Sequence, residues 1–245
     1  MRAETLLEVR EVSVNFGGLL AVDRVSLTVE PGTLAGLIGP NGAGKTTLFN
    51  VIAGVQRATR GAVRLAGRDI SRLAPARRAR LGIGRTYQRL EVFGTLTVRE
   101  NVLVAAESRR RWDRSFAINP LVDDLLERLN LDGMSEDLVD SLPTGSQRLV
   151  ELARALACGP RLLLLDEVAS GLSGYETETM GSVLADLAAG GLGVLLVEHD
   201  ISFVMRLCER VSMLDHGVLM VTGTPTEVQG NPTVQSAYLG SRRSA

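Results

Sequence analysis

The order of apolar and polar positions along the chain predicts strands that alternate with helices. Two early runs, residues 7–14 and 25–29, alternate between apolar and polar side chains and predict half-buried antiparallel strands. The unbroken apolar run at residues 34–38 predicts a buried strand, and residues 45–53 predict the helix after it. Later elements are expected as strands at residues 61–65, 81–86, 161–165 and 193–197, and as a helix at residues 175–189. This alternation indicates an α/β core with a mostly parallel sheet, joined by an antiparallel β subdomain.

The middle of the chain has a helical period instead. Residues 97–107, 120–129 and 146–157 carry apolar side chains at helical spacing, and Thr97 with Glu100 has the form of a capping box. The sequence therefore predicts a helical insert within a single domain that spans residues 1–245. We expect the core at residues 1–89 and 158–245, and the helical subdomain at residues 90–157.

Composition narrows the possible classes of protein. The 245 residues carry a net charge of −1, from 27 basic and 28 acidic side chains, so we expect no nucleic acid among the partners. Cys158 and Cys208 lie among apolar residues, which indicates neither a disulfide nor a metal site. The residues that follow Met1 form no apolar signal segment, and no apolar run reaches the roughly 20 residues of a membrane helix. Any membrane-spanning part must then come from other chains.

The loop between the buried strand and its helix is the first candidate for chemistry. It has the two glycines, lysine and hydroxyl residue of a P-loop, namely Gly39, Pro40, Asn41, Gly42, Ala43, Gly44, Lys45 and Thr46, followed by Thr47. Such a loop aims backbone N–H groups and the positive end of a helix at phosphates. We expect Lys45 to reach the β- and γ-phosphates of ATP and Thr46 to ligate Mg²⁺. The alternative is a glycine-rich turn without a ligand.

Polar residues also follow other predicted strands, where ligands gather in parallel sheets. Asp166 is placed to hold Mg²⁺ through its water shell, and Glu167 to orient or deprotonate the attacking water. His199 follows the strand at residues 193–197 and is expected to contact the γ-phosphate. Gln88, expected to end the strand before the helical insert, can bind the metal or the water. The alternatives are structural: an acidic helix start and a histidine that only packs.

Together these motifs resemble the nucleotide-binding subunits of ABC transporters, over essentially the whole chain. The resemblance makes residues 39–46 the Walker A motif, residues 162–166 the Walker B motif and Glu167 the catalytic glutamate. It makes Gln88 the Q-loop glutamine and His199 the switch histidine. Phe16 stands where the family places an aromatic ring that stacks on adenine, although a core position at a strand end is the alternative. The activity implied is ATP hydrolysis coupled to transport.

Three segments, residues 82–88, 96–102 and 223–240, are similar to the ATPases of branched-chain amino acid importers. This similarity implies import of branched-chain amino acids or a related small polar or amphipathic solute. It implies transmembrane permease subunits, a second ATPase subunit, and an extracytoplasmic substrate-binding protein that acts through the permease. It also implies a cytoplasmic chain that is peripheral on the inner face of the cell membrane.

The signature loop departs from the family's Leu-Ser-Gly-Gly-Gln. The equivalent serine is Pro143, followed by Thr144, Gly145 and Ser146, which remain candidate nucleotide contacts. Ser173 also replaces the D-loop aspartate, and Val168 replaces the proline after the catalytic glutamate. In the family each ATP lies between one chain's P-loop and the other chain's signature loop, so these departures weaken the partner's site. We therefore expect the second ATPase to be a different chain.

Two functions remain open at this point. The first is an ATPase motor that drives import, which intact Glu167 and His199 favour. The second is a nucleotide-dependent dimerising subunit with weak hydrolysis, which the altered signature loop favours. A soluble ABC protein of repair or translation is a further alternative, but such chains carry two ATPase domains or a long coiled coil. Steady-state ATPase activity of the assembled complex separates the first two.

Overall fold

The computed structural model describes residues 5–240 and the side chains of residues 5–236. The N-terminal residues on which we based the expected absence of a signal peptide lie almost entirely outside this range. Within the range, no helix is long and apolar enough to cross a membrane.

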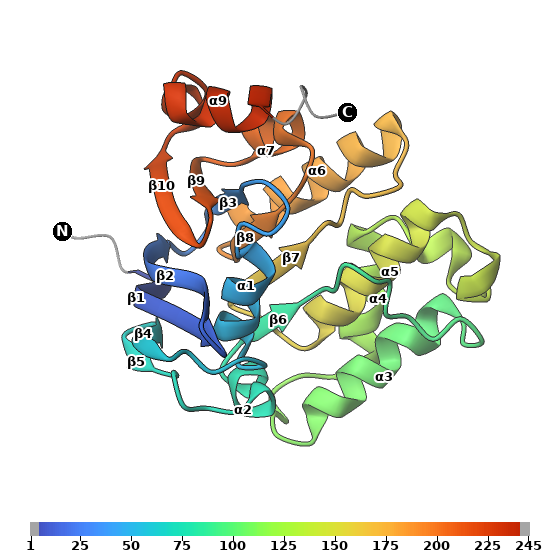
Figure 1. Ribbon diagram of the computed structural model, residues 1–245. Helices are drawn as coiled ribbons and strands as arrows, with labels where there is room; N and C mark the ends of the chain where they lie inside the picture. The colour runs from blue at the N-terminus through green and yellow to red at the C-terminus, as the bar shows by residue number, and fades with distance from the viewer. Residues whose placement is uncertain (1–4, 241–245) are drawn as a thin grey trace.

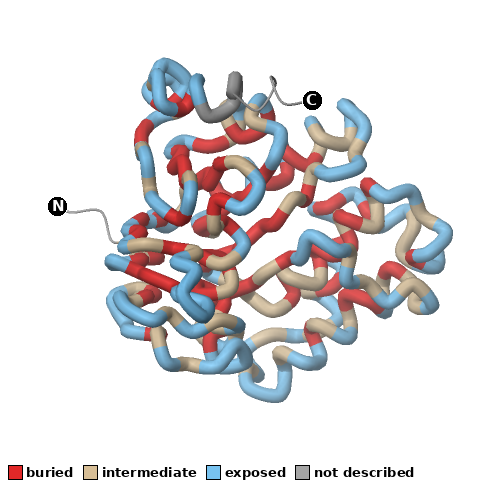
Figure 2. The backbone as a smooth tube through the Cα atoms, viewed as in Figure 1, coloured by how far each residue is buried: buried red, intermediate tan, exposed pale blue. Residues whose placement is uncertain are grey.

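A six-stranded sheet forms the centre of the molecule (Figure 1). Its strands, in spatial order, are β10 (Val218–Gly223), β9 (Arg210–Asp215), β3 (Leu34–Ile38), β8 (Gly193–Val197), β7 (Leu162–Asp166) and β6 (Ile83–Arg85). All neighbours are parallel except β10, which is antiparallel to β9 at one edge. Every residue of β3, β7 and β8 is buried, as the red central strands of Figure 2 show. The unbroken apolar runs are thus covered on both faces, which confirms the predicted parallel core.

A second, antiparallel sheet packs beside the first. Its strands, in spatial order, are β2 (Leu19–Val29), β1 (Leu7–Phe16), β4 (Arg60–Leu65) and β5 (Arg68–Asp69). The inward side chains of β1 and β2 join those of β3, β7 and helix α1 (Lys45–Ala53) in one hydrophobic cluster. This cluster fixes the loop that precedes α1 against both sheets.

The helices surround the central sheet. They are α2 (Pro75–Arg80), α3 (Val98–Arg110), α4 (Ile118–Arg128), α5 (Thr144–Ala157), α6 (Gly174–Ala189), α7 (Ile201–Leu207), α8 (Pro225–Gln229) and α9 (Pro232–Gly240), with short 3₁₀ turns at Asp132–Met134 and Val139–Ser141. In Figure 1, α3, α4 and α5 gather on one side of the sheet. A second hydrophobic cluster joins them to α6, α7 and the sheet. The domain boundaries at residues 90 and 157 stay a prediction.

Some predicted elements have different ends, and others were missed. The capping box at Thr97 and Glu100 is present at the start of α3, as predicted. The predicted strand at residues 81–86 ends at Arg85, so the expectation that Gln88 ends a strand is wrong, and Gln88 lies in the loop that follows. Helix α5 begins at Thr144, two residues before its predicted start. Strands β9 and β10 and helices α2, α7, α8 and α9 were not predicted.

Candidate functional site

The loop from Gly39 to Gly44 joins β3 to α1 and keeps its backbone open toward solvent. Gly39, Gly42 and Gly44 all have positive φ, and a Cβ at Gly39 or Gly44 would overlap a neighbouring backbone oxygen. A Cβ at Gly42 would meet nothing within 4 Å, so the space above the loop is open there. Helix α1 begins without a side-chain cap, which leaves its first N–H groups available to an anion.

Lys45 is buried inside this loop. Its ammonium donates to the carbonyls of Gly39 at 2.6 Å and Pro40 at 3.0 Å. Burial lowers the pKa of Lys45, and the nearby carboxylates of Glu167 and Asp166 oppose that shift. The loop therefore holds a cation directly under the open space that its backbone surrounds.

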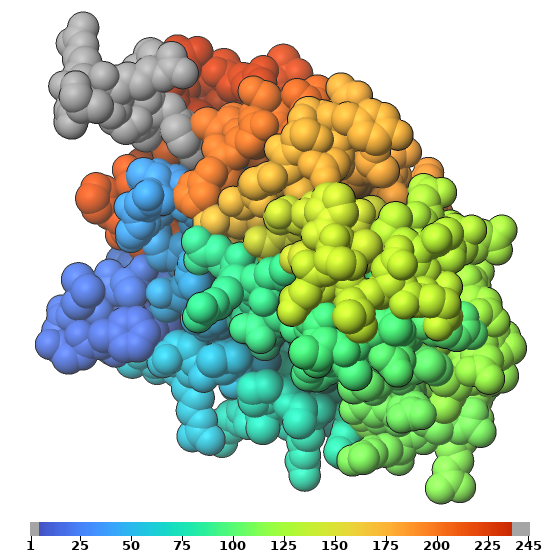
Figure 3. Space-filling model, turned by 90° about the vertical axis from the view of Figure 1, so that its right-hand side faces the viewer, coloured from blue at the N-terminus to red at the C-terminus, as the bar shows by residue number. Residues whose placement is uncertain are grey.

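Residues from three distant parts of the chain meet at this loop. A pocket of about 410 Å³ is lined by Ala21, by residues 41–47 and by Gln88, Glu167 and His199. In Figure 3 the light-blue P-loop region, the teal segment after β6 and the orange segment after β8 lie on the same face. The structure thus brings together the three side chains that the sequence selected after separate strands.

Glu167 is the centre of the polar contacts in this pocket. Its Oε1 lies 2.6 Å from Nε2 of His199, and its Oε2 accepts from Nε2 of Gln88 at 3.1 Å. The backbone of Glu167 has φ of 55°, a strained conformation for a residue with a side chain, and its N–H donates to Val197. This turn, directly after β7, directs the carboxylate out of the sheet and into the pocket.

Asp166 ends β7 and is buried. Its Oδ2 lies 3.3 Å from Nη2 of Arg85, whose Nη1 donates to Asn50 of α1 at 2.7 Å. Burial raises the pKa of Asp166 above its usual range, and Arg85 opposes this shift. Sequence analysis missed Arg85, because nothing in a lone arginine at a strand end reveals that it pairs with a carboxylate 81 positions later.

The donors near the pocket suit a hard divalent cation. They are the Thr46 hydroxyl, the Asp166 carboxylate and the Gln88 amide, all of which offer oxygen, the donor that Mg²⁺ prefers. Among the described residues no group of three or more His, Cys, Asp and Glu side chains could hold a metal by itself. Such a sparse set fits Mg²⁺, which usually takes one or two carboxylates together with substrate phosphates and water.

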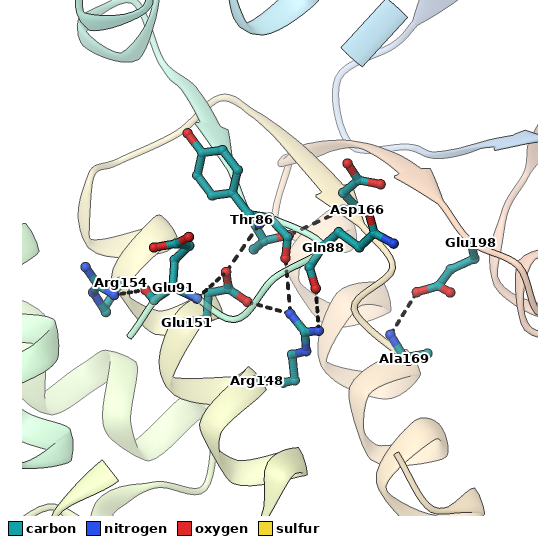
Figure 4. A network of polar contacts seen from close by, with 10 residues as sticks. Thr86, Gln88, Glu91, Arg148, Glu151, Arg154, Asp166, Ala169 and Glu198 are labelled. Carbon is teal, nitrogen blue, oxygen red and sulfur yellow. Dashed lines mark hydrogen bonds and ion pairs between the residues drawn. The ribbon is translucent and has the colours of Figure 1, made fainter. Parts of the chain in front are cut away.

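Glu198 is a second buried carboxyl beside the pocket, and sequence analysis did not select it. Its Oε1 accepts from the N–H of Ala169 at 2.8 Å (Figure 4), and it lies between Val197 and His199. Burial raises the pKa of Glu198 to about 7. The contact ties the loop after β7 to the end of β8, the two segments that carry Glu167 and His199.

We expect Glu198 to make the protein less stable as the pH rises. Its pKa is raised on folding from 4.5 to about 7, so the folded protein holds this proton more tightly than the unfolded chain does. The stability that the proton contributes is complete below pH 4.5 and is lost by about pH 7. Glu198→Gln keeps an acceptor for Ala169 and removes the titration. The free energy of unfolding, measured with urea, should fall between pH 5 and pH 8 by up to about 3 kcal/mol more in the wild type than in the variant. Identical pH dependence in both would contradict the assignment.

The two remaining sets of predicted contacts lie away from this pocket. Pro143 is the N-cap of α5, and its side chain offers no capping bond. The carboxylate of Glu176 in α6 lies beside Gly145, and a Cβ at Gly145 would overlap that carboxylate. Phe16, at the end of β1, is 47% exposed and is not among the described residues that line the pocket.

Comparison with protein families gives two matches. The ABC transporter family matches residues 22–170. The branched-chain amino acid ATP-binding cassette transporter family matches residues 219–243.

Several curated proteins are similar over nearly their whole length. The high-affinity branched-chain amino acid transport ATP-binding protein BraF of Pseudomonas aeruginosa is 37% identical, over 96% of this chain and 98% of its own. LivG of Escherichia coli, which has the same description, is 36% identical over 97% and 99%. The lipopolysaccharide export system ATP-binding protein LptB of Haemophilus influenzae is 35% identical over 97% and 98%.

Solved structures show the same fold. A nucleotide-free ATP-binding cassette of an ABC transporter matches with a TM-score of 0.85 and 28% identity, over 96% of this chain and 98% of that one. An ATP-binding cassette in its ADP conformation matches with a TM-score of 0.85 and 28% identity, over 96% and 99%.

Proposed function

The chain belongs to the ABC transporter family as an ATP-binding, ATP-hydrolysing subunit, and from this premise we propose that it powers import of branched-chain amino acids. The pocket in which Gln88, Glu167 and His199 meet the loop around Lys45 supports ATP hydrolysis as the source of that power. The match of residues 219–243 to the branched-chain amino acid ATP-binding cassette transporter family supports branched-chain amino acids as the substrate. The comparisons do not favour the alternative of a weakly hydrolysing, dimerising subunit.

Within the pocket we assign each side chain a role in hydrolysis. Lys45 and the N–H groups of residues 41–47 bind the β- and γ-phosphates. Glu167 orients the attacking water and takes its proton, and His199, 2.6 Å from Glu167, holds that carboxylate and contacts the γ-phosphate. Gln88 orients the same water. Thr46, Asp166 and Gln88 would hold Mg²⁺, which neutralises charge on the phosphates when bound.

We propose that the start of α5 faces the nucleotide of a second ATPase subunit. Thr144, Gly145 and Ser146 begin this helix, so their N–H groups can bind a phosphate, and Thr144 offers a hydroxyl. Pro143 offers neither a hydroxyl nor an N–H. A hydrogen bond to a charged group contributes about 1.5–3 kcal/mol. Without this bond in the transition state, hydrolysis at the partner's site would be roughly ten- to a hundredfold slower.

We therefore expect a heterodimer in which the site on Lys45 performs most of the hydrolysis. The second ATPase, a different chain, supplies an intact signature loop to that site. Glu167→Gln in this chain should lower the ATPase rate of the transporter far more than the matching change in the partner. The measurement is steady-state hydrolysis by complexes that carry each change alone. A larger loss from the partner's change would contradict this arrangement, as would an active transporter that contains only this ATPase chain.

The segment from Gln88 to Gly94 is proposed to receive a cytoplasmic helix of a permease subunit. Its apolar ring, Phe93, is 44% exposed, and the neighbouring Tyr87 is 45% exposed. The ring of Phe93 rests against Arg154 of α5, 4.5 Å from its guanidinium carbon, so Phe93 does not belong to either buried cluster. Aromatic residues are enriched at protein–protein interfaces relative to the rest of the surface.

Phe93→Asp should weaken assembly with the permease and spare the nucleotide site. A charge at this position would have to be desolvated when the permease helix binds, which costs several kcal/mol. We expect at least a tenfold loss of ATPase chain that co-purifies with the permease. Affinity of the isolated chain for an ATP analogue should stay within about twofold. Val104→Asp, at an exposed position of α3, is the matched control. Co-purification at the wild-type level would rule out this contact.

We infer that the substrate reaches the permease from an extracytoplasmic binding protein, while this chain stays peripheral on the cytoplasmic face of the cell membrane. The test is a transporter reconstituted in liposomes with its binding protein. ATP hydrolysis should rise when the binding protein carries leucine, isoleucine or valine, and labelled leucine should enter the lumen. Stimulation by other solutes alone would overturn the substrate assignment and leave the ATPase assignment intact.

A further inference from the structure

One side of α5 carries three charged residues at a spacing of three positions. They are Arg148, Glu151 and Arg154, and all three contact the segment from Tyr87 to Phe93 (Figure 4). Arg148 is 7% exposed and Glu151 is 5% exposed, so charges that ordinarily face water are buried here. Buried charges need hydrogen-bond partners that replace water. Here the backbone of the segment from Tyr87 to Glu91 supplies them.

The contacts enclose the backbone on both sides of Gln88. Arg148 donates through Nη1 to the carbonyl of Tyr87 at 3.1 Å and through Nη2 to the carbonyl of Gln88 at 2.9 Å. Glu151 Oε1 accepts from the N–H of Tyr87 at 3.2 Å and of Glu91 at 3.4 Å. Arg148 and Glu151 also pair with each other at 3.0 Å.

Arg154 extends these contacts toward the exposed end of the segment. Its guanidinium donates to the carbonyl of Glu91 and lies over the ring of Phe93. From Tyr87 to Glu91, therefore, backbone groups of the loop are held by side chains of α5. The backbone of Phe93 is held instead by Asn101 of α3, which accepts from its N–H and donates to its carbonyl, both at 2.9 Å.

This arrangement does not act mainly to stabilise the fold. Burial raises the pKa of Glu151, which shows that desolvation opposes its charge more than Arg148 and the N–H groups support it. A buried ion pair of this kind adds little net stability, and an apolar pair of similar size often serves a fold as well. The charged pair does more, because its directed hydrogen bonds fix two carbonyls and two N–H groups of a loop in one orientation. Apolar side chains form no such bonds.

We propose that Arg148 and Glu151 are positioning residues that hold Gln88 toward the Glu167 carboxylate. The proposal rests on the catalytic role assigned to Gln88 under the proposed function. Gln88 reaches Glu167 from the loop that Arg148 and Glu151 hold.

The first experiment examines the contacts in the isolated chain. Amide hydrogen exchange of residues 86–94 should accelerate at least tenfold in Arg148→Lys, which keeps the charge but cannot donate to both carbonyls, and in Glu151→Gln. Val150→Ala is the matched control, because Val150 is the fully buried neighbour of Glu151 and belongs to the hydrophobic cluster. It should lower the melting temperature without faster exchange in this segment. Unchanged exchange in both charge variants would overturn the proposal.

The second experiment is a double-mutant cycle in the assembled transporter. Arg148→Lys should lower kcat for ATP by roughly tenfold and leave KM within about twofold. Gln88→Ala should lower kcat at least as much, and the double variant should be no slower than Gln88→Ala alone, because Arg148 acts through Gln88. Multiplicative losses in the double variant would overturn the proposal, as would wild-type kcat in Arg148→Lys. Wild-type kcat in Gln88→Ala would also overturn it, while Lys45→Ala reports separately on the ATPase site itself.

Discussion

Lys45→Ala is expected to weaken the binding of MgATP strongly and to lower the rate of hydrolysis with it. The ammonium lies within a loop whose open side is lined by N–H groups, and it is the buried cation of that loop. Each of its hydrogen bonds to a phosphate contributes about 1.5–3 kcal/mol, so affinity should fall by roughly ten- to a hundredfold or more. Titration with a fluorescent ATP analogue measures this directly.

The variant has a matched control outside the pocket. Arg57→Ala, shortly after α1, removes an exposed positive charge that does not line the pocket. Its affinity should remain within a few-fold of the wild type. Lys45 donates to the carbonyls of Gly39 and Pro40, so its removal also frees those two carbonyls. Melting curves should therefore accompany the titration, and unchanged affinity in a folded Lys45→Ala variant would remove Lys45 from the site.

Glu167→Gln separates binding from chemistry. Glutamine keeps the size of the side chain and can still hydrogen-bond to His199 and Gln88, but it cannot take a proton from water. ATP should bind as in the wild type, and the ATPase subunits should remain associated around it. Turnover should fall by roughly a hundredfold or more. Single-turnover hydrolysis and analytical size exclusion with ATP measure the two effects.

A complex in which every copy of this chain carries Glu167→Gln gives the decisive result. Wild-type turnover in that complex would show that another group activates the water. Glu178→Gln is a suitable control, because Glu178 is an exposed carboxylate of α6 outside the pocket. It should leave both turnover and association unchanged.

The sequence predicted the parts of the fold that depend on local pattern. The apolar runs of β3 and β8 and the helix α1 have the predicted bounds, because short buried strands and a P-loop leave strong local signals. Strand β9 is mostly buried, but Ser212 interrupts its apolar run, and β10 is an apolar run without an apolar/polar alternation, so neither pattern was selected. Helices α2 and α8 were missed because they have six and five residues. Segments this short carry little periodicity.

The residues of the candidate site also fall into two groups, those that belong to a local sequence motif and those whose partners are distant along the chain. Residues that form a motif, such as Lys45 and Glu167, could be selected from their order along the chain. Arg85, Glu151 and Glu198 could not, because each depends on a partner that folding brings to it from 29 to 81 positions away. The sequence predicts which side chains meet the substrate, whereas the groups that orient them appear only in three dimensions.

The carboxylate of Glu176 beside Gly145 has a consequence for the nucleotide contact that we propose at the start of α5. Glu176 is an anion that lies at this helix end and also accepts from the N–H of Ser173 at 2.8 Å. On that proposal, a phosphate that binds there would take the place of Glu176 beside Gly145. Binding would then exchange one anion for another, so the net electrostatic gain would be smaller than at an empty helix end.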